Sequence, residues 1–339
     1  MRVFVYEYAC ARGTGGHALA ARLQVEGWAM LSAFLEDFGR ISGLQTLTLI
    51  EERCAHDERG GRCRRVREPE HESAFRELAA MADFTLLIAP EFDDILRTLC
   101  RWVGESGGRL LGPSAEAVRL TGDKLALSSH LLRSGVPSPA SRLYRAGEPL
   151  STTRFPAVWK PRHGAGSQAT FLVKDAQALD ACLSQARAEG WQGDALVQPF
   201  VPGLPASVAF LTGERGRIPL LPAAQRLSDD GRFRYLGGAV PLPADLSPRA
   251  VQAATRAIAT IPDLRGYVGI DLVLGHAEDG SEDAVIEINP RPTTSYVGLR
   301  ALAETNLAEA LLRMALGDGI PNLLWRNGMV RFDADGAVR

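Results

Sequence analysis

The sequence lacks the cysteine spacings of a disulfide framework or a structural zinc site. Its five cysteines form an odd set without a Cys-X-X-Cys pair: Cys10, Cys54, Cys63, Cys100 and Cys182. Thiols without such a pattern are typical of proteins in a reducing compartment. We therefore expect a cytoplasmic protein whose cysteines mostly serve packing.

Long apolar runs and a dominant charge are also missing. No stretch approaches the ~18 apolar residues that mark a membrane-spanning helix, and the short apolar run at the start carries Glu7, unlike a secretory signal. The net charge is −2 at pH 7, so no strong field attracts nucleic acid or an anionic membrane. We expect no targeting segment and neither of these partners.

The residues that are present suit an α/β protein of several units. The chain has 339 residues, 46% of them hydrophobic and 23% charged, enough for about two or three compact units. Residues 1–112 alternate strand and helix patterns, with strands at 2–8, 44–50 and 84–90. This order predicts an α/β domain, in which the polar, Arg-rich segment 51–72 is an exposed loop.

After this domain the pattern changes. Residues 113–150 form an expected helical connector, 151–203 a smaller lobe of strands around one helix, and 204–339 a larger lobe whose first hairpin turns at 213–216. We expect the charged tail after Phe332 to be loose.

A glycine-rich stretch after the first strand, Gly13 to Ala18, matches the G-X-G-X-X-A pattern of dinucleotide-binding folds. The gap from Tyr8 to Gly13 is longer than the tight turn that this fingerprint needs. The end of the second strand, where the fingerprint has an acid that binds the ribose, also lies too far along the chain. We favour a loop that lines some other substrate pocket and keep an NAD-dependent oxidoreductase as an alternative.

Three oxygen donors stand near the end of the chain. Asp271 lies in an apolar strand pattern, and Glu287 and Asn289 share one face of a second strand after a hairpin-like turn. If these strands pair antiparallel, the three side chains converge, and oxygen is the ligand that Mg²⁺ prefers. Arg291 follows directly. The alternative is a solvated face of an open sheet.

Two lysines complete the candidate site. Lys160 ends an apolar strand and precedes a loop with Gly164, Gly166 and Ser167, whose backbone N–H groups can approach phosphate oxygens closely. An ordinary hairpin turn with an exposed lysine is the alternative. Lys124 begins a helix directly after an N-capping acid.

In their order these features resemble the ATP-grasp superfamily, from about residue 114 to residue 317. The resemblance implies a pre-ATP-grasp (Rossmann-like) domain followed by the α+β ATP-grasp fold of two lobes. It also implies ATP-dependent ligation, in which a carboxylate is activated as an acyl phosphate and displaced by an amine, with ATP and Mg²⁺ (or Mn²⁺) as cofactors.

The same resemblance implies roles for individual residues, although Pro199 and Pro202 stand where such proteins often have a ribose-binding acid. The implied roles are phosphate binding by Lys124, Lys160, Gly164, Gly166 and Ser167; adenine binding by Gln198, Phe200 and Val201; metal binding by Asp271, Glu287 and Asn289; and catalysis by Arg291 and Arg226.

The opening strand and the stretch "EINPRPTTSYVGL" resemble, more narrowly, the tyramine-glutamate ligases of methanofuran biosynthesis and their bacterial relatives in one-carbon cofactor (methylofuran) pathways. That family joins the γ-carboxyl of glutamate to an aromatic amine, which implies glutamate with tyramine or tyrosine as substrates here. Thr293, Thr294 and Ser295 would then bind a substrate near Arg291, unless they only cap a helix, and Glu7 would face the amine.

Two further alternatives stay open: another amino-acid or peptide ligase of the superfamily, and a module that binds ATP without catalysis. The oligomeric state is open as well, with a homodimer as one option.

Overall fold

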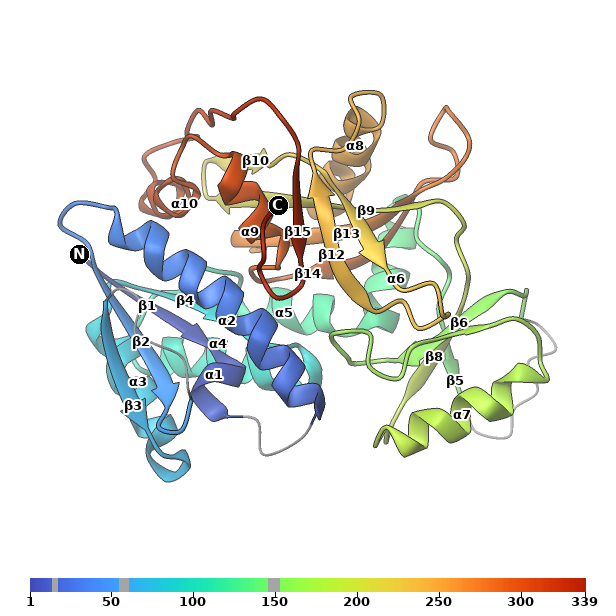
Figure 1. Ribbon diagram of the computed structural model, residues 1–339, viewed down its shortest axis with the longest axis horizontal. Helices are drawn as coiled ribbons and strands as arrows, with labels where there is room; N and C mark the ends of the chain where they lie inside the picture. The colour runs from blue at the N-terminus through green and yellow to red at the C-terminus, as the bar shows by residue number, and fades with distance from the viewer. Residues whose placement is uncertain (14–17, 55–60, 146–152) are drawn as a thin grey trace.

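The computed structural model describes residues 1–13, 18–54, 61–145 and 153–339, with only the backbone for 18–22. Figure 1 shows three groups of elements, each built on its own sheet: a blue-to-cyan N-terminal domain, a green small lobe and a yellow-to-red large lobe. None of the helices within these ranges is both long and apolar enough to span a membrane.

The N-terminal domain is built on a parallel sheet of strand order β3-β2-β1-β4. β1 is buried almost throughout, as expected for an apolar strand that helices cover on both faces. β3 falls in the expected loop 51–72, because its Arg-rich sequence is that of an exposed edge strand, which carries no apolar signal. The elements are β1 (Arg2–Glu7), α1 (Tyr8–Arg12), α2 (Ala18–Gly39), β2 (Gln45–Glu51), β3 (Arg62–Val66), α3 (His71–Met81), β4 (Phe84–Ile88) and α4 (Ile95–Glu105).

The small lobe is an antiparallel sheet of order β5-β8-β6-β7 with α7 packed on it. Two helices, α5 and α6, lead into it from the N-terminal domain. β5 lies within the expected connector 113–150, so this lobe begins earlier than residue 151. The elements are α5 (Ala115–Gly122), α6 (Lys124–Arg133), β5 (Arg142–Tyr144), β6 (Ala157–Pro161), β7 (Phe171–Val173), α7 (Ala178–Ala188) and β8 (Ala195–Pro199).

The large lobe holds a longer antiparallel sheet of order β14-β13-β9-β11-β12-β15, with β10 paired to β9 across the expected hairpin. The tail that we expected to be loose is ordered: β15 pairs with β12, and the Arg331 and Arg339 backbones exchange hydrogen bonds of 3.0 and 2.8 Å. The elements are β9 (Leu204–Gly213), β10 (Gly216–Pro219), β11 (Ala223–Leu227), β12 (Tyr235–Val240), α8 (Ser247–Ile258), β13 (Gly266–Leu274), β14 (Ala284–Asn289), α9 (Ser295–Leu302), α10 (Leu307–Leu316) and β15 (Val330–Asp333).

One hydrophobic core joins the N-terminal domain to the large lobe. α2 packs against α9 and α10, and the rings of Phe34 and Tyr296 stack with centroids 3.9 Å apart. Beside them the buried Asp37 carboxylate accepts hydrogen bonds from the Tyr296 hydroxyl at 2.7 Å and from Arg300 Nε at 2.8 Å. These two units therefore form one continuous body, and residues of this body and of the small lobe together line a cavity.

Candidate active site

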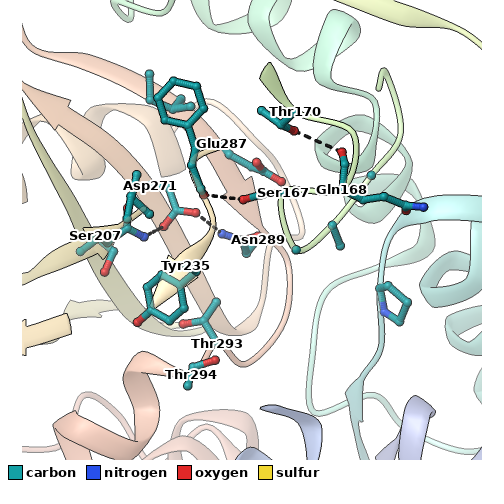
Figure 2. Close-up of a pocket in the computed structure, with 18 of the residues that line it drawn as sticks. Ser167, Gln168, Thr170, Ser207, Tyr235, Asp271, Glu287, Asn289, Thr293 and Thr294 are labelled. Atoms are coloured by element: carbon teal, nitrogen blue, oxygen red, sulfur yellow. Dashed lines mark hydrogen bonds between the residues drawn. The ribbon is translucent and has the colours of Figure 1, made fainter. Parts of the chain in front are cut away.

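A cavity of about 480 Å³ lies where the three units meet. Its lining includes the ends of β1 and β4, the inner face of β6, the glycine-rich loop after it, and the β13–β14 pair. Figure 2 shows the acidic residues of the large lobe facing the loop that carries Ser167, Gln168 and Thr170. The cavity thus brings together residues that are far apart in the sequence.

The three predicted metal ligands lie together on one edge of this cavity. β13 and β14 pair antiparallel, as the hypothesis required, with Asp271 opposite Glu287 and Gly269 opposite Asn289. A bulge in β14 leaves Ile286 without a partner on β13, so Ile286 and Glu287 both line the cavity. Such bulges re-aim side chains next to active sites.

Hydrogen bonds hold Asp271 in place. Asn289 Nδ2 donates to its Oδ2 at 2.9 Å, and Gln225 Nε2 donates to its Oδ1 at 2.8 Å (Figure 2). Burial, with the nearby Glu287 carboxylate, raises the pKa of Asp271 to about 6. Gln225 was not among the predicted site residues.

Lysines face the acids. Lys124 Nζ forms an ion pair with Glu287 Oε1, and Lys160 is 6% exposed at the end of β6. Burial and the Lys124 ammonium lower the pKa of Lys160 to about 8. Burial alone would raise the pKa of Glu287, but Lys124 and Lys160 outweigh it and lower that pKa. Besides these two, the chain has only one other lysine, Lys174.

The residues at this edge fit a hard divalent cation. Within the described residues no three His, Cys, Asp or Glu side chains form a metal-binding group, so the donor set is two carboxylates and an amide. Two carboxylates directly opposite each other on paired strands repel, and a divalent cation that shares their oxygens would relieve this repulsion. Oxygen donors of this kind suit Mg²⁺ or Mn²⁺.

The glycine-rich loop adopts backbone conformations that favour glycine. Gly166 has φ +65°, and Ser167 follows with φ +58°. The Ser167 hydroxyl donates to the Phe233 carbonyl at 2.7 Å, which ties the loop to the large lobe. Gly164, Gly166 and Ser167 all line the cavity opposite the acids.

The predicted adenine-binding residues line the same cavity. Gln198 is buried, and its Oε1 accepts from the Ser141 hydroxyl at 3.2 Å, leaving a second lone pair for a ligand. The Phe200 N–H already donates to the Pro156 carbonyl at 3.0 Å. The Phe200 amide is therefore already paired, and Phe200 and Val201 both line the cavity.

Arg291 lines the cavity and is held by a residue that sequence reasoning missed. Glu91, in the segment after β4, accepts from Arg291 Nε at 2.9 Å and from Nη2 at 3.3 Å. Burial would lower the pKa of Arg291, but Glu91 more than offsets this effect and raises it. The N-terminal domain thus fixes an arginine of the large lobe.

The structure contradicts the assignment of Arg226 to the site. Side chains alternate along β11, so Gln225 and Leu227 line the cavity while Arg226 points to the opposite face. There its guanidinium, 58% exposed, binds the Leu236 carbonyl at 2.7 Å and Asp333 Oδ1 at 2.5 Å.

The four predicted substrate residues all line the cavity. Thr293 and Ser295 share a hydrogen bond of 2.8 Å between their hydroxyls, and Ser295 also contacts the Tyr267 hydroxyl at 3.1 Å. Thr294 and Glu7 complete the set. Of the Gly13–Ala18 motif, residues 14–17 lie outside the described residues.

Comparison with known sequences agrees with this geometry. The ATP-grasp domain family matches residues 121–295, more than half of the chain, and the pre ATP-grasp 3 domain family matches residues 44–118. The chain belongs to the ATP-grasp family. The expected fold is confirmed, and the two lysines, three metal-ligand candidates and Arg291 all lie within the ATP-grasp match.

A relative of this ATP-grasp protein is the tyramine–L-glutamate ligase of Methanocaldococcus fervens, 28% identical over 233 residues. The match covers 69% of this chain and 66% of the relative, just under two thirds of its length. Among solved structures, an ATP-grasp superfamily protein of Archaeoglobus fulgidus has a TM-score of 0.70 at 24% identity, covering 98% of this chain and 92% of that one.

Biotin carboxylase of Campylobacter jejuni, solved as a β-γ-ATP complex, has a TM-score of 0.73 at 16% identity and covers 97% of this chain and 74% of its own. At these identities the likeness to solved structures establishes the ATP-grasp fold, and the chemistry has to be argued from the site itself.

Proposed function

We propose that this protein is an ATP-dependent carboxylate–amine ligase that forms an amide bond through an acyl phosphate. The observation that carries the proposal is the arrangement of charges across one cavity. Buried Lys160 and Lys124 face Asp271, Glu287 and Asn289, with Arg291 beside them. Phosphoryl transfer needs positioning and neutralisation of charge more than a nucleophilic side chain, and this site provides both.

Each residue then has a place in nucleotide binding. Lys124 and Lys160 bind the α- and β-phosphates, and the backbone of Gly164, Gly166 and Ser167 covers them. Gln198, the Phe200 carbonyl and Val201 contact the adenine. Asp271, Glu287 and Asn289 hold Mg²⁺ or Mn²⁺, which when bound neutralises phosphate charge.

The reaction balances without further reactants. A carboxylate oxygen of the donor attacks the γ-phosphorus, and the bond between that phosphorus and the bridging oxygen of ADP breaks. The amine nitrogen then attacks the acyl carbon, the bond from that carbon to the phosphate oxygen breaks, and the nitrogen's proton leaves with phosphate. Arg291, held by Glu91, neutralises the negative charge that develops on the phosphoryl group and on the tetrahedral intermediate.

For the substrates we propose glutamate, through its γ-carboxyl, and an aromatic amine such as tyramine or tyrosine. The supporting observations are the name of the 28% identical relative and a cavity with both apolar and hydroxyl-bearing walls.

The test is ADP release measured with one substrate omitted at a time, together with mass spectrometry of the product. We expect ADP to form only when glutamate and the amine are both present, with one amide per ADP. Glu287→Gln should lower the rate about 10³-fold, because a charged ligand and the partner of Lys124 are lost together. Glu304→Gln, at an exposed position away from the cavity, is the matched control.

Two results would contradict this function. ADP that forms without any carboxylic acid would show simple ATP hydrolysis. ATP binding without turnover for any acid and amine pair would identify a binding module instead.

A further inference from the structure

The wall that the N-terminal domain adds to the cavity differs chemically from the rest. The described cations of the lining, Lys124, Lys160 and Arg291, lie on α6 and in the two lobes. The N-terminal wall is mostly apolar and includes two acids. Its members are Glu7, Tyr8 and Ala9 at the end of β1; Leu23, Glu26 and Met30 on α2; and Ile88, Ala89 and Pro90 after β4.

Glu7 is buried in this wall without a cation. It is 4% exposed, and its carboxylate accepts backbone N–H bonds from Ala9 at 3.1 Å and Cys10 at 2.7 Å. No lysine or arginine among the described residues forms an ion pair with it. A buried carboxylate without a counter-charge is costly, and burial raises the pKa of Glu7 to about 7. The cavity is the place from which a cation can reach it.

The local structure keeps this carboxylate at the cavity. Gly27 of α2 lies so close that a Cβ there would collide with the Glu7 carboxylate. Leu23 and Met30, one turn before and after Gly27, face the same side of α2. Glu7 lies opposite Ile88 in the register of β1 and β4, at the carboxyl end of parallel strands, where ligands bind in α/β folds.

We propose that Glu7 binds the ammonium group of the acceptor amine, while the hydrophobic body of the amine packs against Leu23, Met30 and Ile88. This ammonium releases one proton to water before its nitrogen attacks the acyl carbon, and the second proton leaves with phosphate as described above. This subsite deepens the ligase function proposed above and rests on it. Glu7 lies outside both matched ranges, 44–118 and 121–295.

The subsite also decides between the two acceptors that the function leaves open. In an α-amino acid the carboxylate is one carbon away from the ammonium, so it would lie close to Glu7. The described part of this wall has no cation to balance the repulsion. The acceptor is therefore a primary amine without an α-carboxylate, of the tyramine type rather than the tyrosine type.

The experiment compares wild type with Glu7→Gln, which keeps the size of the side chain and removes its charge. We expect the KM for tyramine to rise about tenfold or more, the usual effect of losing a hydrogen bond to a charged group, with the KM values for glutamate and ATP unchanged. Wild type should use tyrosine at least about tenfold less efficiently than tyramine, as kcat/KM. Glu304→Gln is the control.

Two further measurements guard against a folding defect. Gln has one acceptor oxygen instead of two, so one of the two backbone N–H bonds to this side chain is lost. MgADP binding is therefore measured as a check that the site is intact. Gly27→Ala, which displaces the carboxylate instead of neutralising it, should also raise the KM for tyramine.

Calorimetric binding of tyramine in the presence of MgADP separates this proposal from the ligase function. If wild type binds tyramine about tenfold more tightly than Glu7→Gln but makes no amide, the subsite stands and the ligase function fails. If wild type makes the amide and Glu7→Gln has an unchanged KM for tyramine, the subsite is overturned and the ligase stands. A rise in the KM for glutamate instead, equal use of tyrosine, or no binding of tyramine to wild type also overturns it.

Discussion

The N-terminal domain and the small lobe are attached to the large lobe in different ways. The N-terminal domain shares a hydrophobic core with the large lobe, whereas the small lobe has a core of its own around Trp159 and Phe171. Hydrogen bonds and ion pairs connect the small lobe to the large lobe, such as those from Ser167 to Phe233 and from Arg232 to Glu189. Two walls of the cavity are thus fixed to each other by a shared core, and the third is held by polar contacts.

The functional groups divide in the same way. Glu7, Asp271 and Arg291 lie on the fixed body, while Lys160 and Gln198 lie on the small lobe. In the proposed function the small lobe therefore supplies groups for the phosphates and the adenine, and the fixed body supplies groups for the metal and the substrates.

The largest effect is expected at the joint of the fixed body. Asp37→Ala leaves Tyr296 and Arg300 without their buried partner and should lower the free energy of unfolding by about 3–5 kcal/mol, the cost of breaking a buried ion pair from one side. Urea denaturation measures it. Asp318→Ala, which removes a surface partner of Arg313, should lower the free energy of unfolding by no more than about 1 kcal/mol. If the two variants lost the same stability, the buried contacts of Asp37 would contribute no more than a surface ion pair.

The second prediction concerns the wall that the small lobe forms. Because burial and Lys124 lower the pKa of Lys160 to about 8, about half of its amine should be neutral and nucleophilic at pH 8, far more than for an ordinary lysine with a pKa of about 10.4. Pyridoxal phosphate followed by borohydride should modify Lys160 with a midpoint near that pH, and ATP should protect it. Peptide mapping is simple with so few lysines, and Lys174 provides the exposed control. Modification that rises only above about pH 10, or that ATP does not affect, would contradict the buried site.

A third prediction compares the two cores with the same substitution. Leu183→Ala in the small-lobe core should cost about 2–3 kcal/mol and produce an early, separate unfolding step. Fluorescence reports it, since Trp159 and Trp191 lie 4.8 Å apart in that core. Leu311→Ala, in the core that the N-terminal domain and the large lobe share, should instead lower the midpoint of the main unfolding transition. A single transition shifted equally by both variants would show that the small lobe is not independent.

The smallest effect is expected for Arg226→Ala. Arg226 lies on the outer face of β11 with an exposed ion pair, so kcat and KM should stay within about twofold and stability within about 1 kcal/mol. Steady-state kinetics checks it, with Gln225→Ala, which removes a hydrogen bond to Asp271, as the sensitive neighbour. If Arg226→Ala lowered the activity more than about tenfold, Arg226 would have a role in the active site after all.

The site residues could be predicted from the sequence in the segments where apolar and polar residues alternate regularly. Two strand patterns and a short connection were enough to predict that Asp271, Glu287 and Asn289 converge if the strands pair antiparallel, and the structure pairs the strands in that way. The stretch that holds Gln225 and Arg226 has apolar residues on both sides, so nothing in it shows which side chain faces inward. Of this pair we predicted the charged residue, Arg226, as a site residue, whereas the structure places Gln225 in the lining of the cavity.

Other features could not be predicted because they depend on contacts with residues far away in the sequence. Glu91 contacts Arg291 across 200 positions of sequence, and no local pattern records such a contact. β3 is an edge strand of charged residues, and β15 is short and follows a long irregular segment, so neither shows the alternation that marks a strand. The bulge at Ile286 likewise depends on its pairing with β13.

The most direct test of the central claim follows the carboxylate oxygen. Glutamate labelled with ¹⁸O in its γ-carboxyl is incubated with ATP, Mg²⁺ and tyramine, and the released phosphate is analysed by mass spectrometry. Activation as an acyl phosphate predicts that one labelled oxygen passes into each phosphate, because the amine breaks the bond between carbon and that oxygen. Phosphate that carries no label would contradict the account.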